Sequence, residues 1–290
     1  MPNPRKLTHG NGTSWEITYR IDGRMQLALV RRSHVAAFVA QLVDKGLAAS
    51  TVRHIYHVVA MVMRSACYDR VLTASPCFKI KLPPIPGRTL PVLTPAQVHG
   101  LLTAAPDYDR AVLATAVGTG MRQGEVLGLR LVHLNLLKRE LAVEEQAMTV
   151  PGQAPYVTTD LKTRASRRVV PLPEFVVLEL ARHLEAYGAG VDGLVFPNRR
   201  GKVWRRGSFA ESVWKPALRR AGLNPGFGFH ALRHTYASGL IAENIHPRVI
   251  QARLGHKSIS ETMDTYGHLF PDSRQETTDA LDRLFGSASG

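Results

Sequence analysis

The stretch FHALRHTYASGL, residues 229–240, brings His230, Arg233 and His234 together in an otherwise apolar run. Polar groups in such a run are costly to bury unless something polar meets them. On a helix, residues three apart share a face, so His230 and Arg233 point the same way. Both can donate hydrogen bonds to an anion, and arginine does so through two parallel donors. The spacing therefore favours a helix that binds a phosphate group, while the position of His234 suggests a structural hydrogen bond.

A metal site is the alternative for the same helix. His230 and His234 are four residues apart, as in the helix of zinc proteases, but HALRH lacks the glutamate that serves there as the base. The guanidinium of Arg233 would also repel a dication. The sequence contains no P-loop and no dinucleotide-binding glycine pattern. We therefore expect neither a metal ion nor a nucleotide cofactor.

Two further segments carry candidate cations. In GTGMRQGEVLGL, Arg122 follows a glycine-rich turn and opens a helix whose free N–H groups favour anions. Glu125, three residues on, could cap that turn or orient Arg122. In LKTRASRRVVPL, Lys162 precedes a turn between two strand-like runs, where a mobile lysine could swing toward a ligand. Taken singly, each of these residues is equally explained as a surface charge.

The last segment is ARLGHKSISETMDTYGHL, in which His256 starts a loop and a short helix leads to Tyr266. The neighbours of Tyr266 are polar, which suits a mobile and reachable hydroxyl: Asp264, Gly267 and His268. Tyr236 is the rival tyrosine. It lies six residues after His230 on the same helix, a position that suggests packing or a structural hydrogen bond.

Taken together, five motifs resemble the tyrosine recombinases of the phage-integrase type. They are, in family order, TGMRQGEVLGL, Lys162 on its hairpin, HALRHTYAS, LGHKS and Tyr266. The resemblance is close over residues 92–270, and the helical unit at 33–83 is similar to the core-binding domain of that family. It implies an enzyme that cleaves and rejoins DNA through a covalent 3′-phosphotyrosine, without metal or ATP.

The resemblance also implies a role for each position. Arg122 and Arg233 correspond to the two arginines that clamp the scissile phosphate, and Glu125 to the acidic residue that supports the first of them. Lys162 corresponds to the general acid for the leaving 5′ oxygen. His230 and His256 correspond to two further phosphate contacts, which could also assist as acid or base. Tyr266 corresponds to the nucleophile.

The implied chemistry fits these residue types. A phosphodiester attacked by an oxygen gains negative charge in the transition state, and fixed positive donors stabilise that state more than the ground state. Tyrosine has an ordinary pKa of about 10, so it is a poor nucleophile near neutral pH. We expect the cationic pocket to favour the tyrosine anion. Covalent attack keeps the phosphodiester energy in the phosphotyrosine, so resealing needs no ATP.

Composition agrees with a polyanionic partner. The 290 residues include 37 Lys and Arg against 23 Asp and Glu, a net charge of +14. No apolar run approaches the ~18 residues that span a bilayer, and the first residues have no secretory apolar region. Cys67 and Cys77 are the only cysteines, which favours free thiols. We expect a cytoplasmic protein of a bacterial or phage-infected cell, associated with the nucleoid.

The predicted fold is mainly α with a small antiparallel sheet, a helical core-binding domain followed by the catalytic domain of DNA breaking-rejoining enzymes. Alternation around Asp22-Gly23 predicts a hairpin over residues 14–30. Five prolines between residues 79 and 95 indicate a linker, and Thr94, Pro95 and Gln97 start the next helix. We expect a reduced N-terminal hairpin at residues 1–30 and a core-type DNA-binding domain at 31–83. A linker at 84–91, a catalytic domain at 92–270 and a tail helix at 271–290 would follow.

Further elements follow from periodicity. Two helices are predicted over 33–70, with Ser33 and Ser50 as caps, and the second carries Arg53, His57 and Arg64 off its apolar stripe. That basic face is equally typical of a DNA-binding and of a solvated surface. In the catalytic domain we expect a helix over 122–134 and strands over 141–148 and 167–172. The other expected helices are at 96–104, 108–117, 173–187, 208–221, 230–242, 246–254 and 259–264.

The resemblance also implies partners. These are double-stranded DNA core or attachment sites, a homotetramer assembled on them, and a directionality factor or a host DNA-bending protein, with no role for a membrane. Two alternatives stay open: a topoisomerase with the same phosphotyrosine chemistry, and a DNA-binding protein without catalysis. The second has no need of Tyr266. The apolar stripe on the tail helix could dock on a neighbouring protomer or on its own domain.

Overall fold

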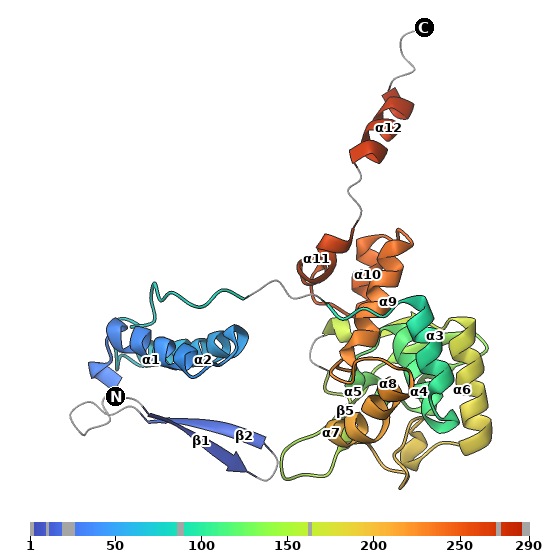
Figure 1. Ribbon diagram of the computed structural model, residues 1–290, viewed down its shortest axis with the longest axis horizontal. Coiled ribbons are helices and arrows are strands. Elements are labelled where there is room, and N and C mark those ends of the chain that lie inside the picture. Colours follow the sequence, from blue (N-terminus) through green and yellow to red (C-terminus); the bar gives the residue numbers. More distant parts are fainter. Residues whose placement is uncertain are drawn as a thin grey trace. The chain divides into compact units, whose positions relative to one another are not determined.

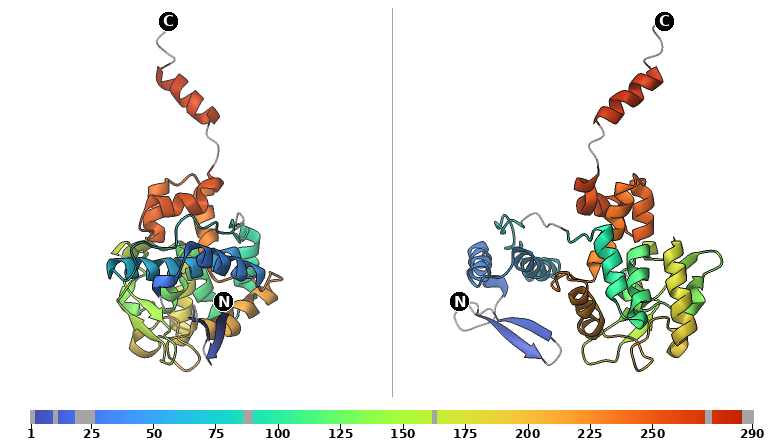
Figure 2. Two further views of the ribbon diagram at one scale, coloured as in Figure 1. Left: turned by 90° about the vertical axis from the view of Figure 1, so that its left-hand side faces the viewer. Right: turned by 45° about the vertical axis from the view of Figure 1, so that its right-hand side comes forward.

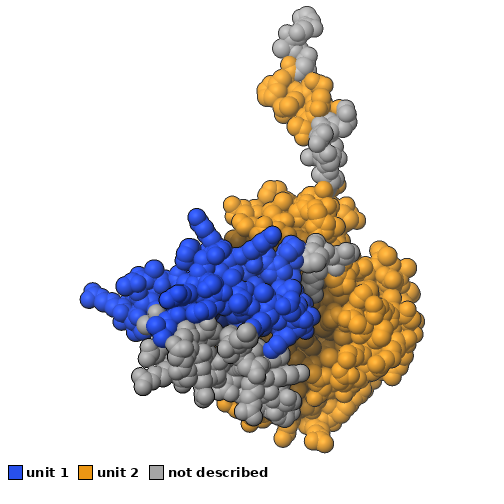
Figure 3. Space-filling view, turned by 60° about the vertical axis from the view of Figure 1, so that its left-hand side comes forward, with its two compact units in different colours: residues 1–89 blue, residues 90–290 orange. Residues whose placement is uncertain are grey.

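The computed structural model describes residues 3–9, 12–18, 27–85, 90–161, 164–270 and 274–285. The chain divides into two compact units, residues 1–89 and 90–290, which Figure 3 colours separately. Helices dominate and the sheets are small and antiparallel, so the predicted fold class is confirmed. Among the described residues, no helix is long and apolar enough to cross a membrane.

The first unit begins with a hairpin of two antiparallel strands, β1 (Asn3–His9) and β2 (Gly12–Thr18), visible in Figure 2. The predicted position of the hairpin is wrong, because residues Leu27–Leu29 form a 3-10 helix and not a second strand. Asp22 and Gly23 lie outside the described residues. The sequence offers a second turn signal at Gly10-Asn11, and it is this signal that lies between the paired strands.

Two helices follow, α1 (Arg32–Asp44) and α2 (Ala49–Tyr68). They pack through a small apolar cluster made by Phe38, Val39, Leu42 and Val52. Both helices begin before the predicted caps, since Arg31 and Ala48 hold the cap positions. The amide N–H of Arg31 donates to Nδ1 of His34 at 3.2 Å, so an unexpected side chain serves the start of α1.

The basic residues of α2 separate into two kinds. Arg53 is half-buried, and its Nε donates to the carbonyl of Pro83 at 2.9 Å, so this guanidinium holds the extended segment after the helix. His57 and Arg64 are exposed. The predicted basic face is therefore reduced to these two side chains.

The second unit is built from helices around one apolar core (Figure 1). Its helices are α3 (Pro95–Ala104), α4 (Asp107–Thr119), α5 (Gln123–Leu127), α6 (Glu174–Tyr187), α7 (Arg206–Phe209), a π-helical turn (Ala210–Trp214), α8 (Lys215–Arg220), α9 (His230–Ala242), α10 (Pro247–Leu254), α11 (Ile259–Tyr266) and α12 (Arg274–Phe285). Short 3-10 turns lie at Leu131–His133, Arg164–Ser166, Val191–Gly193 and Gly267–Leu269. Helix α4 is buried almost throughout and contacts α3, α5, α6 and α9, which makes it the central helix of the unit.

The entry to the second unit matches the predicted helix start. Thr94 Oγ1 accepts from the N–H of Gln97 at 3.2 Å, and Gln97 Oε1 accepts from the N–H of Thr94 at 2.9 Å. Just before it, the N–H of Leu93 donates to Oγ1 of Thr235 at 2.9 Å. Leu90 packs against a cluster that includes Tyr266. The end of the proline-rich segment is therefore fixed to α9 and its surroundings.

Two small sheets replace the single hairpin that the sequence predicts. Strands β3 (Leu134–Asn135), β4 (Glu140–Val143) and β7 (Arg168–Pro171) form one, in the order β3-β4-β7; β5 (Gln146–Met148) and β6 (Tyr156–Thr158) form the other. The predicted strand at 141–148 is interrupted between Val143 and Gln146, where the carboxylate of Glu145 lies 3.3 Å from Nε of Arg130 and 3.2 Å from Nε2 of His133. The predicted helix at 122–134 stops at Leu127. Gly128 follows, and a Cβ there would lie 2.5 Å from the amide nitrogen of Ala147, so this glycine lets α5 pack directly on β5.

Candidate active site

Helix α9 holds a buried arginine in a fixed position. Arg233 is 2% exposed, its Nη1 donates to the carbonyl of Gly120 at 2.8 Å, and its Nη2 donates to the carbonyl of Leu254 at 2.7 Å. The two acceptors lie at the C-terminal ends of α4 and α10. The last carbonyls of a helix have no partner within it and carry partial negative charge. Three helices therefore orient this guanidinium before any ligand arrives.

Two glycines make this arrangement possible. Gly120 and Gly255 have positive φ angles, 63° and 66°, a region that non-glycine residues rarely adopt. A Cβ on Gly120 would lie 2.3 Å from the ring of Tyr236, and one on Gly255 would lie 2.9 Å from Nη1 of Arg168. Both glycines therefore end a helix and let another side chain approach the backbone closely.

Arg122 caps α5 and is held by Glu125. The N–H of Arg122 donates to Oε2 of Glu125 at 2.9 Å, and its Nη1 donates to Oε1 at 2.9 Å. Its Nη2 also donates to the carbonyl of Gly255 at 3.2 Å. Glu125 therefore does both things that the sequence left open, since it caps the turn and orients the arginine. The side chain of Arg122 is 30% exposed, so it can reach a ligand.

Sequence reasoning missed Arg168, the second partner of Glu125. Its Nη2 lies 2.9 Å from Oε2 of Glu125, and its Nε donates to the carbonyl of Arg253 at 2.7 Å. The signal that could have found it is the alternation of β7. Val170 is buried, and by the two-residue period of a strand Arg168 lies on the same face.

The charges of this cluster do not balance. The guanidinium groups of Arg122 and Arg168 bond to the carboxylate of Glu125, and the charge of a third, Arg233, interacts with the same carboxylate. Burial alone would raise the pKa of Glu125, but Arg168 and Arg122 hold it below its ordinary value. Burial, followed by the charge of Arg122, lowers the pKa of Arg233 to about 9, which still leaves it cationic at neutral pH. The pocket thus has an excess of fixed positive charge that an anion would compensate.

Two histidines belong to the same electrostatic environment. Burial and the charge of Arg233 lower the pKa of His230 to about 4, although part of its side chain reaches solvent. The same two causes, in the same order, lower the pKa of His256 to about 4. Nδ1 of His256 lies 2.8 Å from Oγ1 of Thr262, a buried residue of α11. Both rings are therefore neutral at pH 7 while the site is empty.

Tyr266 is buried, which contradicts the predicted mobile and reachable hydroxyl. It is 1% exposed, and the predicted stabilisation of its anion is also wrong for the DNA-free chain: burial raises its pKa to about 12, despite the opposing charge of Arg233. The hydroxyl lies 2.8 Å from Nδ1 of His234, so the predicted structural hydrogen bond of His234 is confirmed. The reason for the burial is the apolar cluster that surrounds the ring: Ala237, Ile241, Ile250 and Leu254.

Two other predicted residues remain. The ring of Tyr236 packs against Gly120, in agreement with a packing role. Lys162 lies outside the described residues. Among the described residues, no group of three or more histidine, cysteine, aspartate or glutamate side chains could hold a metal ion.

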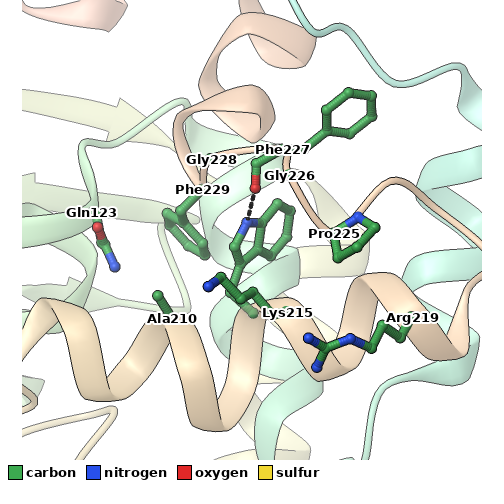
Figure 4. Close-up of a pocket in the computed structure, with 10 residues that line it drawn as sticks. Gln123, Ala210, Lys215, Arg219, Pro225, Gly226, Phe227, Gly228 and Phe229 are labelled. Carbon is green, nitrogen blue, oxygen red and sulfur yellow. Dashed lines mark hydrogen bonds between the residues drawn. The ribbon is translucent and has the colours of Figure 1, made fainter.

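Figure 4 shows a groove of about 610 Å³ in the second unit. Gln123 and Phe229, which are next in the chain to Arg122 and His230, line it together with Lys215 and Arg219 of α8. Nε1 of Trp214 donates to the carbonyl of Phe227 at 2.6 Å and so fixes the loop that forms one wall. The groove therefore carries two cationic side chains, those of Lys215 and Arg219.

Comparison with known proteins gives a consistent result. The model of the phage integrase family matches residues 91–272, more than half of the chain. A tyrosine recombinase XerC-like protein of Caldanaerobacter subterraneus subsp. tengcongensis is 26% identical over 287 residues, with 90% of this chain and 73% of the relative covered. The ICEBs1 integrase of Bacillus subtilis is 26% identical over 268 residues, with 88% of this chain and 71% of the relative covered.

Solved structures agree on the fold. The Tn1549 transposon integrase in complex with a circular intermediate DNA superimposes with a TM-score of 0.77 at 19% identity, over 89% of this chain and 86% of that one. A lambda integrase dimer bound to a core site gives a TM-score of 0.59 at 17% identity, over 87% and 83% of the two chains. The second unit thus carries the motif residues on the same architecture as these proteins.

Proposed function

Because the chain belongs to the phage integrase family, we propose that it is a site-specific recombinase that cleaves and rejoins DNA through a covalent 3′-phosphotyrosine at Tyr266. The observation that carries the proposal is the pocket of Arg122, Arg168 and Arg233 around one carboxylate. Its excess positive charge suits a phosphodiester, whose charge grows during attack. Donors fixed in advance stabilise that growing charge without reorganisation.

Each step of the proposed strand cleavage can then be assigned to a residue. Arg122 and Arg233 bind the non-bridging oxygens of the scissile phosphate, with His230 and His256 as further hydrogen-bond partners. Tyr266 passes its hydroxyl proton to a neutral histidine of the site, for which we propose His230 or His256, as its oxygen bonds to phosphorus and the bond to the 5′ oxygen breaks. That oxygen takes up a proton, for which we propose Lys162. Attack by a 5′ hydroxyl of another strand reverses these steps, and the bond energy kept in the phosphotyrosine is enough to reseal the strand.

The buried position of Tyr266 adds one requirement. Apolar side chains enclose its ring, and its hydroxyl is already bonded to His234. We therefore propose that DNA binding displaces α11 and breaks the contact between Tyr266 and His234. A bound phosphate would also raise the pKa of His230 and His256 toward ordinary values, because a nearby anion favours the charged ring.

The relatives suggest the biological setting. They include an integrase and Xer-type recombinases, which supports a mobile element such as a phage or a transposon as the source of the DNA. We propose that the substrate is double-stranded DNA at core or attachment sites, in the cytoplasm of the cell that holds the element. A tetramer on two such sites, helped by a directionality factor or a DNA-bending protein, would complete the exchange.

Two further surfaces support DNA binding. The groove lined by Lys215 and Arg219 also contains Gln123 and Phe229, the chain neighbours of Arg122 and His230, and we propose that the DNA backbone on one side of the scissile phosphate runs along it. In the first unit, His57 and Arg64 lie exposed on α2, and we propose that they contact the same core site. Arg53 has a structural bond to Pro83 and is a weaker candidate.

The test is a suicide substrate that carries a nicked core site taken from DNA that flanks the gene. After incubation in EDTA, a denaturing gel should reveal protein covalently attached to DNA. A second assay with two labelled duplexes should yield exchanged strands, which a topoisomerase acting on single duplexes would not produce. Binding without any covalent complex would instead identify a DNA-binding protein and contradict the proposal.

A further inference from the structure

We propose that Arg168 is a positioning residue for DNA cleavage, which fixes Glu125 so that this carboxylate can hold Arg122 against the phosphate. The inference rests on the proposed function. It concerns a residue that we place outside the phosphate contact, because each of its three guanidinium nitrogens already donates within the protein and two of them donate to Glu125.

The geometry of the carboxylate carries the first step. Oε1 of Glu125 accepts from Nη1 of Arg122 at 2.9 Å and from Nη1 of Arg168 at 3.3 Å. Oε2 accepts from the N–H of Arg122 at 2.9 Å and from Nη2 of Arg168 at 2.9 Å. Each oxygen therefore binds both arginines. The planar fork of Arg168 sets the plane of the carboxylate, and the carboxylate sets the direction of Arg122.

The backbone contacts of Arg168 carry the second step. Its Nε donates to the carbonyl of Arg253 at 2.7 Å and its Nη1 to the carbonyl of Ser166 at 2.9 Å. The guanidinium also lies against Gly255, whose carbonyl accepts from Arg122. Arg168 thus joins β7 to α5 and to the end of α10, and it touches both groups that hold Arg122. A single side chain links the elements that surround the phosphate site.

The buried negative charge of Glu125 explains why position 168 needs a cation. Glu125 is 2% exposed, and burial by itself favours its protonated form. Without Arg168, the carboxylate would keep hydrogen bonds to only one arginine, Arg122, and its pKa would rise. A protonated Glu125 donates through one oxygen and can no longer accept from Arg122 on both. Loss of Arg168 would therefore release Arg122 at a pH where the wild-type site is still assembled.

The experiment compares Arg168→Met with the matched control Arg167→Met in the full chain. Arg167 is exposed and immediately precedes Arg168 in the chain. We expect Arg168→Met to slow formation of the covalent complex on the suicide substrate by on the order of 10²-fold, as misplaced catalytic groups do. Its DNA Kd should change much less. The cleavage rate should also fall at a higher pH than in the wild type when the pH is lowered, whereas Arg167→Met should keep the wild-type profile.

The variant Arg168→Lys controls for misfolding, because lysine keeps the positive charge and loses only the planar, two-pronged geometry of the guanidinium. It should keep the pH profile near that of the wild type at a reduced rate. A pH profile of Arg168→Met that matches Arg167→Met, with an unchanged rate, would overturn the positioning role.

A second readout does not depend on activity. Glu125→Gln should lower the Tm of the wild-type chain, because it breaks two ion pairs. In the Arg168→Met background the same substitution should lower it far less or raise it, because it removes a poorly compensated buried carboxyl. Equal effects in both backgrounds would overturn the contact on which the inference rests. Absence of covalent complex in the wild type would overturn the proposed function and the role in cleavage, while this thermal cycle would still decide whether Arg168 holds Glu125.

Discussion

The hydroxyl of Tyr266 lies 2.8 Å from Nδ1 of His234, the residue that follows the phosphate-binding candidate Arg233. One helix, α9, therefore carries both the proposed phosphate ligand, Arg233, and the hydrogen-bond partner of the proposed nucleophile, Tyr266. The tyrosine also lies in an apolar cluster with Ile241, Ile250 and Leu254. In the DNA-free chain, the reactive group is thus part of the packed interior.

Tyr266→Phe is expected to abolish the covalent complex and leave the DNA Kd nearly unchanged, because only one hydroxyl is removed. Denaturing gels after incubation with the suicide substrate measure the first effect, and titration with labelled duplex measures the second. Tyr236→Phe is the control and should keep the covalent complex, since its ring packs against Gly120. A complex that persists in Tyr266→Phe would assign the nucleophile to another residue.

His234→Phe should loosen α11 without a direct effect on phosphate binding. The substitution leaves the buried hydroxyl of Tyr266 without its hydrogen bond to His234, which costs about 1–3 kcal/mol for a buried group. Hydrogen exchange of the amides in residues 259–266 should become faster. His230→Phe, on the same helix, serves as the comparison. Equal exchange in His234→Phe and the wild type would mean that the apolar cluster alone holds the tyrosine.

Arg122→Lys and Arg233→Lys are expected to reduce cleavage far more than binding. Lysine keeps the charge but cannot make the planar two-pronged contact, nor reach both carbonyls that now orient Arg233. Loss of one such donor typically costs ~10²–10³ in rate. Single-turnover cleavage and equilibrium binding should be measured on the same duplex. Parallel losses in both would indicate that the arginines only hold DNA.

The DNA-free protein should lose stability between pH 7 and pH 5, in part through His256. Its pKa is lowered to about 4 in the folded chain, against an ordinary value of 6.5. In that window the unfolded chain binds more protons, so stability is fully present above 6.5 and falls as the pH drops toward 4. His256→Asn should therefore show a smaller decrease in Tm over this interval than the wild type. An identical decrease would remove His256 from the explanation.

DNA binding by both units can be tested with fragments. Residues 90–290 should bind a core site more weakly, and with a shallower salt dependence, than residues 31–290, because fewer phosphates are neutralised. The shorter fragment starts at residue 90, since Leu90 packs into the cluster around Tyr266. Titrations at several salt concentrations give both slopes. Identical affinities and slopes would exclude residues 31–83 from the DNA-binding surface.

Much of the helical framework could be read from the sequence, since its signals are local. The cap formed by Thr94 and Gln97 and the helix that begins at His230 follow from short-range patterns. The predictions that failed concern elements whose ends depend on contacts between distant residues. The predicted strand is interrupted where Glu145 lies beside Arg130, and Gly128 ends the predicted helix where the backbone of β5 approaches.

In the candidate site, too, some features follow from local sequence patterns and others depend on contacts between distant residues. Motif order identified Arg122, Glu125 and Arg233, and the structure brings these three together. The pairing of Arg168 with Glu125 joins residues 43 positions apart, so no local pattern contains it. The burial of Tyr266 also escaped prediction. Its sequence neighbours are polar, while the residues that enclose it come from α9 and α10.

The two glycines of the site also extend the sequence signature by which relatives with an intact pocket can be recognised. A search for the arginines, histidines and tyrosine alone would accept copies in which a larger residue replaces either glycine. Gly120 and Gly255 each present the backbone at a φ angle that favours glycine, with no room for a Cβ. A genome survey that also requires TG before the first arginine and LG before His256 would discard those copies without any structural calculation.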